Sequence, residues 1–191
     1  MSVLRNSTAA LSLLVLAGAL APALAPVALA EESVEVGGAP MYPSKNIIEN
    51  AVNSADHTTL VAAVQAAGLV DTLSGPGPFT VFAPTNAAFE KLPDGTVETL
   101  LEPENKEKLA SILTYHVVPG TVTAHDLDAM IEAGGGKATM TTVNGSDLTV
   151  SQKDGHLWVW DASGGGAMVT IGDVMQSNGV IHVIDTVLLP K

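Results

Sequence analysis

Three two-residue turn signals divide the second half of the chain and restrict it to strand-rich folds. Asn144-Gly145, Asp154-Gly155 and Asn178-Gly179 each join two runs in which apolar and polar residues alternate. Such pairs favour the tight turns of β-hairpins, because glycine, asparagine and aspartate tolerate positive φ. After the glycines at 134–136 the sequence therefore predicts five strands, in the stretches ATMTTV, DLTVSQ, HLWVW, MVTIGDVMQ and VIHVIDTVLL.

The preceding part of the chain has mainly helical periodicity. Apolar residues recur at helical spacing after Ser44 and after Asp56, each of which can cap a helix, and again over residues 103–116. Thr123 with Asp126 can form a capping box for a short helix. Helices with one strand among them, followed by a strand-rich half, indicate the α+β class and not an alternating parallel sheet.

The stretch FTVFAPTNAAFEKL at 79–92 predicts a strand that turns directly into a helix. Its first residues are strong β-formers, and Pro84 ends the strand because it cannot donate a hydrogen bond to a neighbour. Thr85 can then accept from the backbone of Ala87 or Ala88 as a helix cap. The polar residues of this corner are thus expected to be structural.

The N-terminus has the pattern of an export signal. Arg5 is the only charge before Glu31, the apolar run at 9–20 is too short to span a bilayer, and Ala28-Leu29-Ala30 fits a cleavage site. We expect a mature protein that is periplasmic or extracellular, peripheral at most on the cell surface, without a transmembrane segment. The expected division is a signal peptide at 1–30, a flexible leader at 31–43 and a single domain at 44–190.

Composition excludes several classes of function. The chain has no cysteine, which excludes disulfides, thiol nucleophiles and iron–sulfur clusters. Residues 31–191 contain seven lysines against twenty acidic residues, a formal charge of −13, so nucleic acid is not an expected partner.

No spacing in the chain indicates catalysis. No serine-nucleophile motif occurs, no phosphate-binding loop is complete, and no two histidines are four residues apart. We therefore expect no enzyme activity, no metal and no cofactor. The five histidines are His57, His116, His125, His156 and His182.

Trp158 and Trp160 share one face of a predicted strand, with Val159 on the other. They could pack against a helix, the interpretation we favour, or form an aromatic platform for a ligand. The sequence leaves both open.

Three segments together resemble the fasciclin (FAS1) domain family, in its single-domain secreted bacterial form: FTVFAPTNAAFEKLP at 79–93, LTYHVVPG at 113–120 and SNGVIHVIDTVLLP at 177–190. The resemblance covers roughly residues 44–190. It implies a wedge-shaped β-sandwich with helices packed along one side, in which the first and last of these segments pair.

The resemblance also indicates which residues could contact a partner. The Tyr-His pair that is linked to adhesion in animal members falls on Tyr115 and His116, and Val117 and Val118 follow it. These four are interaction candidates, although a purely structural role explains them as well. Other motif residues are expected to be structural: Pro84, Thr85, Asn86, Asn178, Gly179, His182 and Asp185.

The leading functional hypothesis is a non-catalytic adhesion or protein-interaction module, whose partner is a protein or glycan of the cell surface or envelope. The chain itself would be a monomer or weak homodimer. The alternative is a carrier of a lipid or carbohydrate, held between sandwich and helices or on the two tryptophans.

Overall fold

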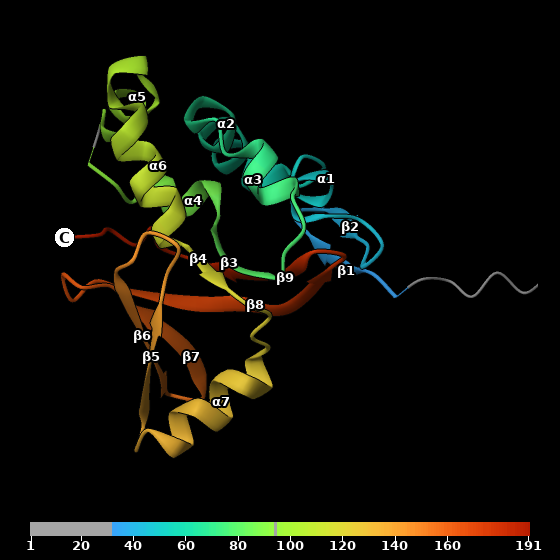
Figure 1. Ribbon diagram of the computed structural model, residues 1–191, viewed down its shortest axis with the longest axis vertical. Helices are drawn as coiled ribbons and strands as arrows, with labels where there is room; N and C mark the ends of the chain where they lie inside the picture. Colours follow the sequence, from blue (N-terminus) through green and yellow to red (C-terminus); the bar gives the residue numbers. More distant parts are fainter. Residues whose placement is uncertain (1–31, 94) are drawn as a thin grey trace, which may run out of the picture. The chain divides into compact units, whose positions relative to one another are not determined.

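A seven-stranded mixed sheet forms the centre of the structure. The computed structural model describes residues 32–93 and 95–191 (Figure 1), and the expected signal peptide at 1–30 lies outside them. In spatial order the strands are β4 (Val117–Pro119), β3 (Phe79–Pro84), β9 (Gly179–Ile184), β8 (Gly166–Gln176), β7 (His156–Trp160), β6 (Asp147–Lys153) and β5 (Lys137–Thr141).

Neighbouring strands of this sheet are antiparallel, except that β3 and β9 run parallel with Phe79 opposite Gly179 and Pro84 opposite Ile184. The predicted pairing of the first and last motif segments is therefore confirmed. The predicted turns also lie where expected, between β5 and β6, between β6 and β7, and between β8 and β9.

The sheet folds over so that its two halves share an apolar core. Side chains of this core include Phe82 and Ile184 from β3 and β9, and Val150 and Val159 from β6 and β7. Helix α7 (Ala124–Ala133) packs against β5 and β6 on the same side. The Val143 amide donates to the Val117 carbonyl at 2.8 Å, which ties the β5–β6 turn to β4.

The remaining helices cover the other face of β3 and β9. Figure 1 shows them together on one side of these strands, with α7 on the opposite side. Val81 and Ile181, which alternate with Phe82 and His182, join the helices in a second apolar core. The α+β sandwich with helices along one side is thus confirmed. The helices of this layer are α1 (Ile47–Ala51), α2 (Thr58–Ala67), α3 (Val70–Ser74), α4 (Asn86–Glu90), α5 (Thr96–Leu101) and α6 (Lys106–Tyr115), with 3₁₀ turns at Ala55–His57 and Pro103–Asn105.

The prediction of a flexible leader before Ser44 is wrong for the described part of that segment. β1 (Val34–Val36) and β2 (Ala39–Met41) form an antiparallel hairpin, joined by Gly37 and Gly38 at positive φ. Val36 and Met41 are buried against the helical layer. Apolar residues on one face of both strands therefore order the hairpin.

Helix α1 also begins later than the sequence suggested. Its cap is Asn46 and not Ser44: Asn46 Oδ1 accepts from the Glu49 amide at 2.9 Å, and Glu49 Oε2 accepts from the Asn46 amide at 2.9 Å. The capping box of Thr123 and Asp126, by contrast, is present as predicted.

Candidate functional site

Tyr115 and His116 close helix α6 inside the domain. The Tyr115 hydroxyl donates to the Asp147 carbonyl and accepts from the Ala162 amide, both at 3.0 Å. Since Asp147 begins β6 and Ala162 lies between β7 and β8, this one hydroxyl joins helix α6 to two sheet segments.

His116 joins the same helix to the C-terminal segment. Its Nε2 accepts from the Leu188 amide at 3.0 Å, so Nδ1 carries the proton and donates to the Ile112 carbonyl at 2.8 Å. Burial lowers the pKa of His116 from 6.5 to about 4, although the Ile112 carbonyl and Asp161 act in the opposite direction. The imidazole is therefore neutral at pH 7, with both nitrogens used.

None of the four predicted interaction residues presents its side chain to solvent. Tyr115, His116, Val117 and Val118 are 0, 2, 4 and 4% exposed. Val117 and Val118 lie in β4, opposite Val81 and Thr80 of β3. Direct contact of these side chains with a partner would require the domain to open, so their positions favour the structural alternative.

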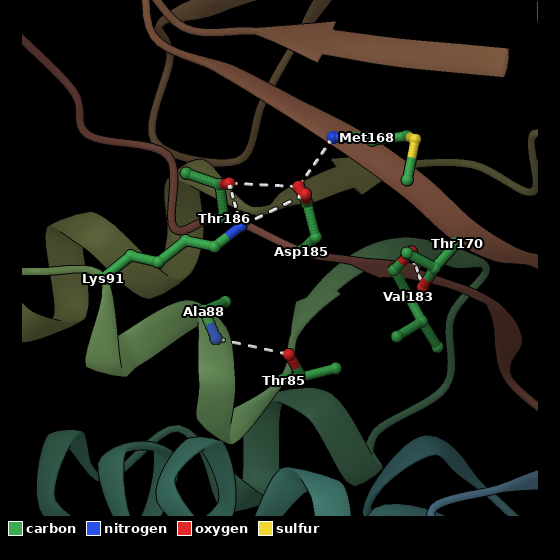
Figure 2. A network of polar contacts seen from close by, with 8 residues as sticks. All are labelled: Thr85, Ala88, Lys91, Met168, Thr170, Val183, Asp185 and Thr186. Carbon is green, nitrogen blue, oxygen red and sulfur yellow. Dashed lines mark hydrogen bonds and ion pairs between the residues drawn. The ribbon is translucent and has the colours of Figure 1, made fainter.

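The corner at 84–86 joins β3 to the helical layer. Thr85 Oγ1 accepts from the Ala88 amide at 3.3 Å and caps α4, as predicted (Figure 2). Asn86 Oδ1 accepts from the Thr59 amide at 3.0 Å, and its Nδ2 donates to the Ala55 carbonyl at 2.8 Å. Asn86 thereby fixes the start of α2 beside α4.

Asn178 and Gly179 have an equally complete structural role. Asn178 Oδ1 accepts from the Ile47 amide at 3.0 Å, while Nδ2 donates to the carbonyls of Leu73 and Gly75 at 2.8 and 3.0 Å. A Cβ at Gly179 would lie 1.9 Å from the Phe79 carbonyl oxygen, so no larger residue fits without separating β3 from β9.

His182 supports a bulge in β8. Its Nδ1 accepts from the Asp173 amide at 3.3 Å, which places the proton on Nε2, and that nitrogen donates to the Val122 carbonyl at 2.8 Å. The ring stacks on Phe82 with 5.6 Å between centroids. Burial lowers the pKa of His182 and outweighs the opposing effects of Val122 and Asp173.

Asp185 organises a polar cluster at the end of β9, shown in Figure 2. Its Oδ1 accepts from the Met168 amide at 2.9 Å and from the Thr186 hydroxyl at 3.0 Å, and its Oδ2 pairs with Lys91 at 3.2 Å. Burial alone would raise the pKa of Asp185, but the bonds from Met168, Lys91 and Thr186 prevail and lower it. The cluster ties α4 to β8 and β9.

Trp158 and Trp160 lie on the face of β7 opposite the buried Val159. Both are half-buried, and their rings stack with 5.7 Å between centroids. The ammonium of Lys153 lies 5.6 Å from the centre of the Trp158 ring, and Trp160 Nε1 donates to Ser151 Oγ at 2.8 Å. Because α7 packs on the Val159 side, the favoured prediction that a helix covers the tryptophans is not what the structure shows.

Sequence reasoning missed two buried polar residues in the helical layer. Asn50 Oδ1 accepts from the Tyr42 backbone amide at 3.0 Å, and Asn50 Nδ2 donates to the Tyr42 carbonyl at 2.8 Å. The same Nδ2 also donates to Gln176 Oε1. His57 is 1% exposed; its Nδ1 bonds Ser54 Oγ at 2.9 Å, and its Nε2 has no hydrogen bond of ordinary geometry. Asn50 lies on the predicted apolar face of its helix. A polar residue at such a position is the sequence signal that could have indicated a buried, hydrogen-bonded side chain.

The described residues contain no group of three or more histidine, cysteine, aspartate or glutamate side chains arranged to hold a metal. Among the same residues, no helix is both long and apolar enough to cross a membrane.

The sequence of this domain matches the model of a known protein family. The model of the fasciclin domain matches residues 55–190. This chain belongs to the fasciclin domain family. Members of the fasciclin domain family are extracellular, adhesion-related proteins.

Several fasciclin relatives match over most of their length. Protein sll1483 from Synechocystis sp. is 49% identical over 88% of this chain and 86% of its own. Immunogenic protein MPB70 from Mycobacterium bovis is 39% identical, over 73% of this chain and 66% of its own.

Among solved structures, a FAS1 domain pair from the insect cell adhesion molecule fasciclin I has a TM-score of 0.69 at 19% identity. The match covers 84% of this chain and 58% of the insect chain, and shows the shared fold.

Proposed function

We propose that this fasciclin protein is a non-catalytic adhesion or interaction module of the cell exterior. The main support for the proposal is that polar side chains of the family motif are hydrogen-bonded inside the domain. His116, His182, Asn86 and Asn178 each bond backbone groups of segments distant in sequence. Groups engaged in this way hold a scaffold, and recognition is left to the outer surface.

The family and the N-terminal sequence support the same setting. Its relatives include a cell surface glycolipoprotein, MPB83, of Mycobacterium bovis, which is 42% identical over 64% of this chain. The export pattern at residues 1–30 directs the chain to the same side of the membrane. Its partner is a protein or glycan of the surface or envelope.

Binding to the envelope tests this function directly. Purified protein, labelled at its amines, is titrated onto immobilised envelope fraction from the producing cells, with a heat-unfolded sample as control. Saturable binding by the folded protein alone is expected. Binding that does not saturate, or that the unfolded sample equals, would contradict the proposal.

A ligand carrier is the second candidate, and an apolar crevice beneath the helices is where it would hold its ligand. An apolar space of about 30 Å³ lies between α1, α2, α6 and the sheet. A neighbouring space of about 20 Å³ shares Ile47, Ala51, Leu60 and Val81 with it and is also lined by His57. Spaces of this size hold a water molecule and not an acyl chain, since one water needs about 10–15 Å³ measured in this way. A carrier would therefore have to part α1 from α2.

Native mass spectrometry of protein taken from its own cells separates the two candidates. The adhesion proposal predicts the mass of the chain alone. A bound lipid that survives purification would favour the carrier.

A further inference from the structure

The outer face of the β5–β8 region has the composition of a carbohydrate-binding surface. Strand registers place its side chains in rows across the strands. One row contains Thr139, Thr149, Trp160 and Gly166, and the next contains Lys137, Ser151, Trp158 and Met168. The aromatic rings of β7 thus lie beside hydroxyl and amine groups of β5 and β6.

Trp160 is held in place on this face, and the Trp158 ring stacks on it. A Cβ at Gly166 would lie 2.7 Å from the Trp160 ring, so the indole rests directly on the β8 backbone. The bond from Trp160 Nε1 to Ser151 fixes the same ring from the other side. Neither ring belongs to the two apolar cores of the described residues. A prepositioned ring loses little conformational freedom when a ligand stacks on it.

A polar group on this face also lacks a partner. The Trp158 Nε1–H is shielded from solvent and has no acceptor among the described residues. Lys153 is exposed, and its ammonium lies 5.6 Å from the centre of the Trp158 ring, where it can donate to a ligand oxygen. The Lys153 ammonium is the accessible donor here, and it suits a ligand rich in oxygen acceptors.

The charge of the face argues for an uncharged ligand. Lys137 and Lys153 are balanced at its margins by Asp147, which accepts from the Thr141 hydroxyl at 2.8 Å, and by Asp154 in the β6–β7 turn. The whole chain carries a formal charge of −12, so a locally balanced face stands out from the rest. A polyanion would meet repulsion from the remainder of the surface, and a lipid would meet hydroxyl groups around only two rings.

We propose that the outer face centred on Trp158 and Trp160 binds an uncharged glycan chain. The C–H face of a sugar ring packs against the stacked indole pair, while its hydroxyl groups bond Lys153 and the neighbouring threonines. This inference rests on the proposed function and names the class of partner and the site that would bind it.

Intrinsic fluorescence offers a direct readout, because the chain's two tryptophans both lie on this face. The full-length protein is titrated with laminarin and with hydroxyethylcellulose, and migration through gels containing each polymer is compared. A saturable change in emission and retardation by at least one of them, both unaffected by 0.5 M sodium chloride, are expected.

Variants distinguish stacking from other causes. Trp158→Ala should weaken binding about two- to twelve-fold, since an aromatic contact of this kind is worth about 0.5–1.5 kcal/mol beyond its buried area. Lys153→Met should weaken it about two-fold. Met130→Ala removes an exposed apolar side chain from α7, 37% exposed, and should bind as wild type. Urea unfolding of each variant verifies that it is folded.

Three results would overturn the inference: no response to either neutral polymer, equal binding by Trp158→Ala and wild type, or salt-sensitive binding to polygalacturonate alone. If envelope binding persists when the glycan tests fail, the interaction module stands and this site is wrong. If envelope binding also fails, the functional proposal fails with it.

Discussion

His116 makes the stability of the domain depend on pH in a calculable way. In the folded protein its pKa is lowered from 6.5 to about 4, because burial disfavours the charged ring. The unfolded chain therefore binds a proton between these values that the folded chain does not. The contribution is complete above pH 6.5, falls as the pH decreases toward 4, and amounts to about 3 kcal/mol at 1.36 kcal/mol per pKa unit.

Urea unfolding at pH 7, 5.5 and 4.5 measures this effect. Burial also lowers the pKa of His57 and of His182, so these rings steepen the loss in the same direction. In His116→Gln the free energy of unfolding should fall less steeply as the pH decreases. The difference in slope corresponds to about one proton, which is roughly 1.4 kcal/mol per pH unit at most. His125→Gln, at an exposed position on α7, is the matched control and should follow wild type. Equal slopes for His116→Gln and wild type would refute the assignment of a buried, neutral His116.

Three substitutions test the packing by urea or thermal unfolding. Phe82→Ala removes a ring that is 0% exposed and should cost about 3–5 kcal/mol; a barely shifted transition would contradict its burial. Asn178→Ala leaves three backbone groups without partners and should cost about 2–4 kcal/mol, whereas Asn53→Ala, with one exposed bond, should cost under about 1 kcal/mol. Gly179→Ala should prevent folding because its Cβ would meet backbone at 1.9 Å, while Gly145→Ala, in open space at φ +89°, should cost only about 1 kcal/mol; similar costs for both would refute the close approach.

Local signals in the sequence predicted local structure well. Asn178-Gly179 and the two earlier pairs predicted their turns, and the change of period after Pro84 predicted a strand followed by a capped helix. Each of these depends on backbone preferences within about four residues. The hairpin at 34–41 was not predicted, because its strands are only three residues long and Pro40 interrupts one of them.

The roles of the candidate site residues depended on contacts distant in sequence. His116 can be buried at low cost because its acceptor nitrogen receives a hydrogen bond from the amide of Leu188, 72 residues away. No periodicity near position 116 contains that information. The period of two correctly placed Trp158 and Trp160 on one face, but it could not show that α7 would cover the other.

The most direct measurement of the central claim uses Tyr115→Phe, which removes only the hydroxyl that joins helix α6 to two sheet segments. If the Tyr-His pair serves the fold, the free energy of unfolding should drop by about 1–3 kcal/mol. The affinity of the folded variant for the envelope fraction should remain that of wild type. Unchanged stability together with lost binding would contradict the claim and make Tyr115 a partner contact.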